Sequence, residues 1–126
     1  MPNWCYNKVS ITNNADDNSK LQKVKELLHS NASDDSEENV FDFNNVVPEP
    51  EETDDWYMWR VNNWGTKWNS SCAEITYEDE ETLEYQFDTA WSPPEPIILQ
   101  LREKFGDDIH ISAFYDEPSM EFAGYL

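Results

Sequence analysis

Two alternating runs of residues decide the fold: Cys72-Ala73-Glu74-Ile75-Thr76-Tyr77-Glu78 and Leu83-Glu84-Tyr85-Gln86-Phe87-Asp88. In each run apolar and polar residues alternate, as they do in a β-strand with one buried face. Only four residues, Asp79-Glu80-Glu81-Thr82, join the two runs. A connection this short and this polar predicts a β-hairpin.

Strand and helix patterns flank this hairpin on both sides. Residues 6–12 alternate and predict a strand, whereas residues 20–28 carry their apolar side chains on one helical stripe. After the hairpin, a helix is predicted from Ser92, as its N-terminal cap, to Gly106, as its C-terminal cap. Residues 109–115 alternate again and predict a last main strand.

The order of these elements is strand, helix, insertion, strand, strand, helix, strand. It predicts an α+β fold of the ferredoxin-like, split βαβ type, with an antiparallel sheet and two helices on one face. A length of 126 residues fits a single domain, 1–126. A short edge segment is predicted at residues 121–125.

The insertion, at about residues 30–70, is too long for a plain loop. It is acidic and rich in aromatic residues, so we expect it to pack on the domain. Within it, residues 40–43 predict a short strand, and Gly65 predicts a turn that brings Trp64 and Trp68 together.

The chain carries 27 Asp and Glu against 8 Lys and Arg, a net charge of −19. Direct binding to nucleic acid needs an excess of basic residues, so this charge argues against it and against an anionic membrane surface. Hydrophobic residues make up 38% and aromatic residues 14%, which favours a folded domain over disorder. Because the sequence shows no secretion signal and no long apolar run, we expect a soluble, cytoplasmic protein.

The negative charge is concentrated in two parts of the chain. Residues 34–59 sum to −10 and residues 71–126 to −12, whereas residues 1–33 and 60–70 sum to +1 and +2. Such a surface can imitate the phosphates of a nucleic-acid duplex, which carries one charge per roughly 1.7 Å of axis. A solubility face or adaptation to high salt would give the same composition.

The predicted partner-binding residues are the acids of the insertion, two neighbouring indoles that suit an interface, and the hairpin tip. They are Asp34, Asp35, Glu37, Glu38, Glu49, Glu51, Glu52, Asp54, Asp55, Trp56, Trp59, Glu78, Asp79, Glu80 and Glu81.

Motifs for other chemistry are weak. The acidic run that begins at Asp34 lacks the central glycine of an EF-hand loop, and we predict no metal site and no cofactor. There is no nucleophile elbow, P-loop or dinucleotide fingerprint, so no catalytic residue is predicted. Cys5 and Cys72 fit small core or sheet-face positions.

Several local phrases are similar to the YubB-type ferredoxin-like domain family, whose members occur mainly in phages, prophages and plasmids. The phrases are Met1-Pro2-Asn3-Trp4-Cys5, Trp64-Gly65-Thr66-Lys67-Trp68, Thr89-Ala90-Trp91-Ser92-Pro93-Pro94 and Phe122-Ala123-Gly124. The resemblance implies the same fold and a bacterial host cell, but no reaction. This chain departs from the family pattern in its acidity between Asp34 and Asp55.

The motif residues Asn3, Trp4, Trp64, Trp68 and Trp91 are predicted to be structural and to hold the insertion across one end of the sheet. Indoles can also stack on bases, but such platforms come with more basic residues than this chain has.

These observations predict a non-enzymatic inhibitor encoded by a phage or mobile element. Its partner would be a basic host protein that processes nucleic acid in defence, such as a CRISPR effector or a restriction factor. The alternative is an enzymatic or small-ligand-binding module with a pocket near the Trp motifs. A regulatory oligomer formed through sheet edges is a third possibility.

Overall fold

The structure, a computed structural model, describes residues 3–126. Within this range an antiparallel five-stranded sheet has the strand order β2-β3-β1-β4-β5. The strands are β1 (Trp4–Asn13), β2 (Ser71–Glu78), β3 (Thr82–Ala90), β4 (Ile109–Glu117) and β5 (Phe122–Tyr125).

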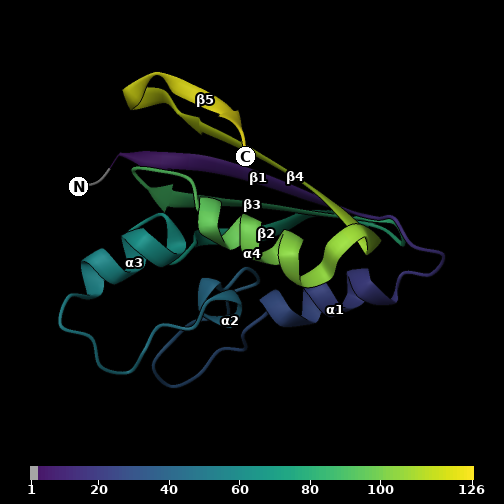
Figure 1. Cartoon of the computed structure of the whole chain (residues 1–126), viewed down its shortest axis with the longest axis horizontal. Helices are drawn as coiled ribbons and strands as arrows, with labels where there is room; N and C mark the ends of the chain where they lie inside the picture. The colour runs from purple at the N-terminus through teal and green to yellow at the C-terminus, as the bar shows by residue number, and fades with distance from the viewer. Residues whose placement is uncertain (1–2) are drawn as a thin grey trace.

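Four α-helices accompany the sheet within residues 3–126, and Figure 1 shows them on one side of it. They are α1 (Ser19–Leu28), α2 (Phe43–Val46), α3 (Trp56–Trp64) and α4 (Glu95–Phe105), with short 3-10 turns at Gly106–Asp108 and Pro118–Met120. The order β1-α1-β2-β3-α4-β4 confirms the predicted ferredoxin-like α+β fold. The predicted edge segment at residues 121–125 forms β5.

The core lies between the sheet and its helices. Along β1, Cys5, Asn7, Val9 and Ile11 are buried, while the residues between them are not. Helices α1 and α4 bury their apolar stripes on this face through residues such as Leu21 and Ile98. The alternation read from the sequence therefore sets which face of the sheet the helices cover.

The predicted strand at residues 40–43 is wrong. Phe43 begins the short helix α2, and the only bridge nearby within the described range joins Ser30 to Asn39. The carboxylate of Asp42 accepts a hydrogen bond from the Asn44 backbone N–H at 2.9 Å and caps the helix. Phe41 and Phe43 are both buried, so both rings belong to the core.

The predicted N-terminal cap of α4, Ser92, is also wrong, whereas its C-terminal cap Gly106 and the turn at Gly65 are confirmed. The Gly65 turn does not pair the two indoles as predicted, since Trp64 packs against Phe43 and Trp59 while Trp68 lies beside Trp4. Pro94 occupies the N-cap position of α4, and the Ser92 hydroxyl donates instead to the Gly65 carbonyl at 2.6 Å. Gly65 has a φ of 81° and ends α3. A Cβ atom there would lie 2.7 Å from Cδ of Pro96, so the position requires glycine for space as well as for conformation.

Trp64 joins the segment between α1 and β2 to the core. Its ring is buried, packs against Phe43 and Trp59, and donates its indole N–H to the Val47 carbonyl at 2.8 Å. Replacing Trp64 by Ala should lower the free energy of unfolding by about 3 to 5 kcal/mol, because it leaves a large cavity and an unpaired carbonyl. Urea denaturation measures this change.

Trp56 provides the matched control, since it is also a tryptophan but lies at the other end of α3 and is 47% exposed. Trp56→Ala should cost less than about 1 kcal/mol. Similar losses for the two variants would show that Trp64 is not an anchor of the fold.

Candidate partner-binding surface

Helix α3 is defined by a signal at each end. At its start, the Met58 backbone N–H donates to the Asp55 carboxylate at 3.1 Å, which makes Asp55 the N-terminal cap. At its end stands the left-handed Gly65. The sequence prediction missed this helix, although a capping residue at Asp55 and a glycine at position 65, with nine residues between them, are the signals that indicate one.

One ion pair fixes the acidic loop to α3. The Arg60 guanidinium donates to both carboxylate oxygens of Glu49, from Nε at 2.6 Å and from an Nη at 2.9 Å. The same guanidinium lies over the rings of Trp56 and Trp64, 4.9 and 5.2 Å from their centroids. The hydrogen bonds from Arg60 lower the pKa of the Glu49 carboxyl. The Glu49 carboxylate is therefore already paired with a cation of the same chain.

The acidic loop, residues 49–55, presents the charges that follow Glu49 to solvent. Glu51, Glu52 and Asp54 are exposed, and the loop borders an open hollow of about 700 Å³ together with Trp56. Trp56 is 47% exposed, whereas Trp59 is half-buried against the core. Of the two indoles predicted to contact a partner, Trp56 is the accessible one.

A second acidic segment lies in the loop between α1 and α2. Asp34, Asp35, Glu37 and Glu38 are all exposed, and the Ser30–Asn39 bridge closes the base of this loop. Glu38 lies 2.8 Å from the His29 ring. Figure 1 shows this loop and the acidic loop projecting on the helix side of the molecule, away from the sheet.

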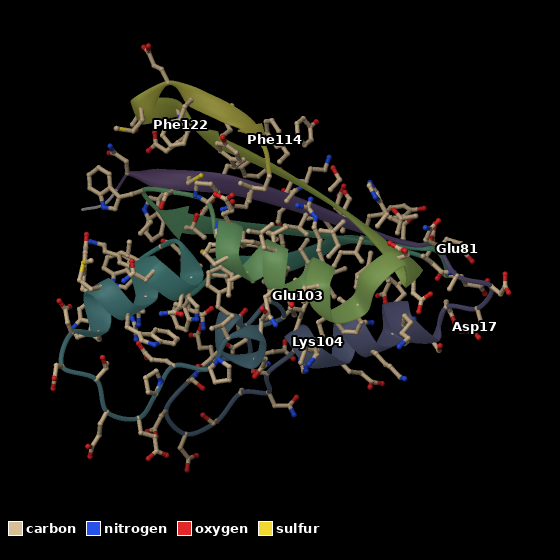
Figure 2. The ribbon with its side chains drawn as sticks, in the orientation of Figure 1. Asp17, Glu81, Glu103, Lys104, Phe114 and Phe122 are labelled. Atoms are coloured by element: carbon tan, nitrogen blue, oxygen red, sulfur yellow. The ribbon has the colours of Figure 1, made fainter. Side chains whose placement is uncertain are left out.

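The hairpin tip, residues 78–81, lies elsewhere. Figure 2 shows Glu81 near Asp17, at the end of the molecule opposite α3. Glu78 pairs with Lys25 at 2.6 Å. Asp79 accepts the backbone N–H groups of Glu81 and Thr82 and the Tyr77 hydroxyl, and these hydrogen bonds lower its pKa. The structure thus divides the predicted acidic residues between two ends of the molecule.

The Trp motifs meet at the end of the sheet where β1 begins and β3 ends. Asn3 accepts the Trp91 backbone N–H at 2.8 Å, and the rings of Trp4 and Trp68 lie 6.0 Å apart. Thr66 donates to the Ala90 carbonyl at 2.8 Å, which attaches the Trp64–Trp68 phrase to β3. Trp64 is buried, whereas Trp4, Trp68 and Trp91 are 38%, 37% and 42% exposed.

Groups suited to catalysis or metal binding are sparse in the described part of the chain. Burial raises the pKa of the Cys5 thiol to about 11, so little thiolate is present at neutral pH. Cys72 is exposed. Among residues 3–126, no group of three or more His, Cys, Asp or Glu side chains is placed to hold a metal ion.

The fold belongs to the class of ferredoxin-like α+β domains. Residues 63–126, half of the chain, match the family model described as "Ferredoxin-like domain in Api92-like protein", so the chain belongs to this family. Most of the segment between α1 and β2 precedes the matched residues, and its being an insertion relative to the family stays a prediction.

The chain is also similar to a crystal structure of the protein api92 from Yersinia pseudotuberculosis. The TM-score is 0.58 with 18% sequence identity, over 71% of this chain and 36% of that chain. This likeness shows the fold alone, and the chain spans about a third of the length of that protein. The comparison with curated proteins gave no match. Across residues 3–126, none of the helices has both the length and the apolar character needed to cross a bilayer.

The Glu49–Arg60 pair predicts a pH dependence of stability. Because the pKa of Glu49 is lowered in the folded state, its stabilising effect is present above the unfolded value of 4.5 and disappears as pH falls through the folded value. Glu49→Gln should lower the free energy of unfolding by about 1 kcal/mol at neutral pH. That difference from the wild type should shrink as the pH drops below the unfolded value.

Urea denaturation between neutral pH and pH 3 measures the difference. Glu51→Gln is the control, since this substitution removes the same charge from an exposed residue in the same loop. A Glu49→Gln difference that stays constant with pH would show that the ion pair does not stabilise the fold.

Proposed function

We propose that this protein is a non-enzymatic inhibitor that binds a basic, nucleic-acid-processing defence protein of a bacterial host. Its contact surface comprises the acidic loop and the exposed acids of residues 34–38. The binding would compete with nucleic acid, because carboxylates in exposed loops offer a basic groove the charge that phosphates otherwise supply.

The observation that supports this proposal is that most of these carboxylates have no cation of the same chain beside them. In the described residues Lys and Arg form three ion pairs, and of these only Glu49–Arg60 involves the acidic loop or residues 34–38. Glu38 in addition lies 2.8 Å from the His29 ring. The other acids there, which face solvent, are Asp34, Asp35, Glu37, Glu51, Glu52, Asp54 and Asp55. Unneutralised carboxylates on a folded chain repel one another, and this repulsion favours binding to a surface of opposite charge.

The class of target follows from charge and from the resemblance to phage and plasmid proteins. CRISPR effectors line their heteroduplex channels with basic residues and read a short duplex motif with arginines, so an acidic protein has a site to occupy. Restriction factors offer a comparable groove. Such a target would place the protein in the bacterial cytoplasm.

The hollows favour this binding function over the alternative of an enzymatic or ligand-binding module near the Trp motifs. The hollow beside Trp91 measures about 170 Å³. Pockets that enclose small-molecule ligands usually measure roughly 300 to 1,000 Å³. The larger hollow at the acidic loop is open and lined almost entirely by the loop itself.

The test is the variant Glu51→Lys, Glu52→Lys and Asp54→Lys. It reverses charges that have no internal partner and spares Glu49 and Asp55, which stabilise the fold. Affinity capture from a bacterial host at low and high salt should recover a basic nucleic-acid-binding protein with the wild type. Capture should fall at high salt and on addition of duplex DNA, and the variant should lose it at least tenfold.

The matched control is Glu26→Lys, Glu103→Lys and Glu121→Lys, which changes the net charge equally at scattered exposed positions. This control should keep most of the binding. Equal loss in both variants would mean that total charge, not the acidic loop, decides binding. Capture that the loop variant leaves unchanged would contradict the proposed surface.

A further inference from the structure

A group of large apolar side chains is exposed at the end of the sheet beside α3. We call it the end patch: Trp4, Tyr57, Val61, Trp68 and Trp91, each between 37% and 46% exposed. Monomeric proteins rarely leave several large aromatic side chains uncovered at one place, and such patches mark interaction sites. The end patch is therefore unlike the scattered exposed residues elsewhere.

The backbone holds Trp91 outward at a conformational cost. Trp91 has a φ of 71°, in the left-handed region that residues other than glycine avoid. Its backbone N–H donates to Asn3, and the next N–H, of Ser92, donates back to the Ala90 carbonyl. Residues kept in such conformations cluster at functional sites, where the surrounding structure fixes them.

The side chains of α3 and of the β3–α4 connection enclose one hollow. It measures about 170 Å³ and is lined by Tyr57, Val61 and Trp91 with Thr66, Lys67, Ala90 and Ser92. Lys67 is engaged with the Trp68 ring, 4.4 Å from its centroid. A hollow this small and largely apolar suits a single side chain better than a cofactor.

The acidic loop continues directly into the end patch. Asp54 and Asp55 precede α3, and Tyr57 stands in its first turn. On this part of the chain, Arg60 already shows how a cation is received, between a carboxylate and two indoles. A partner here would meet apolar rings bordered by unneutralised carboxylates, which is the arrangement of an interface anchor with a charged rim.

We propose that the end patch is the apolar anchor of the interface with the basic partner, an inference that rests on the proposed function. One apolar side chain of the partner occupies the hollow between Tyr57, Val61 and Trp91. The Arg or Lys residues on either side of it lie along the acidic loop. The indoles thus make the surface select partners with an apolar residue between basic ones, whereas charge alone would bind many basic partners.

Defined peptides test this anchor. The probes are Arg-Arg-Gly-Leu-Gly-Arg-Arg, the same peptide with Ala in place of Leu, and a version with Glu in place of each Arg. We expect the Leu peptide to bind on the order of tenfold more tightly than the Ala peptide, because it buries an additional apolar side chain. The Glu peptide should not bind. Calorimetry and NMR shifts of the indole N–H groups report the binding.

Trp91→Gly is the informative variant, since glycine removes the indole and accepts the positive φ, so the fold is retained. It should bind the Leu and Ala peptides equally. Tyr125→Ala is the matched control, because Tyr125 is 71% exposed on β5, outside the end patch, and should keep the preference for Leu.

The outcomes separate this inference from the proposed function. If the Leu and Ala peptides bind wild type equally and the Glu51, Glu52 and Asp54 reversal weakens both, the anchor is refuted and the acidic surface stands. If Trp91→Gly keeps the Leu preference, the anchor lies elsewhere and the inference fails. If no Arg peptide binds, both the anchor and the acidic surface are contradicted.

Discussion

The buried contact of Trp64 is the constraint on which the rest of the structure depends. Its ring packs on Phe43 and its N–H donates to Val47, so two parts of the long segment between α1 and β2 are held by one side chain. Gly65 then turns the chain toward β3, and it packs so closely against Pro96 that a residue with a Cβ atom would not fit. Without this attachment, the acidic loop would have no fixed position relative to the sheet.

The same attachment positions the cation that pairs with the acidic loop. Arg60 lies over the ring of Trp64 and binds Glu49 with two hydrogen bonds, so the cation nearest the acidic loop is placed by the core. A planar guanidinium can stack on indoles and bind a carboxylate at once, whereas a lysine ammonium cannot do both in this geometry. One arginine therefore fixes the base of the loop and leaves its tip charged.

The sequence predicted the parts of the fold that depend on repetition and missed those that depend on single contacts. Alternation in β1, β3 and β4 and the apolar stripe of α1 follow from periodicity, and all were predicted. Residues 40–43 read as a strand because Val40, Phe41 and Phe43 have β-propensity. In the structure they pair with no strand of the sheet, because the cap at Asp42 favours a helical turn from Phe43 onward.

The candidate site shows the same division. The acidic residues and the Trp phrases could be named from the sequence, but not their grouping, because residues 34–38 and 49–55 both lie on the helix side while residues 78–81 lie at the far end. Tertiary placement also removed Glu49 and Glu78 from the free charges, since each pairs with a cation distant in sequence. Composition counts charges but cannot show which are already paired.

The uncovered face of the sheet offers the main competing surface, and its details favour the end patch instead. Phe114 lies on the side away from the helices, beside Tyr6 and Tyr125 around a hollow of about 380 Å³ (Figure 2). These rings pack on one another, and the cation at this hollow, Lys8, pairs with Glu84 at 3.3 Å. Beside the end patch, by contrast, Glu51, Glu52 and Asp54 of the acidic loop pair with no cation, and Trp91, in its left-handed backbone conformation, is 42% exposed. A surface with unneutralised carboxylates beside an apolar hollow has more to gain from a basic partner than one whose charges and rings already satisfy each other.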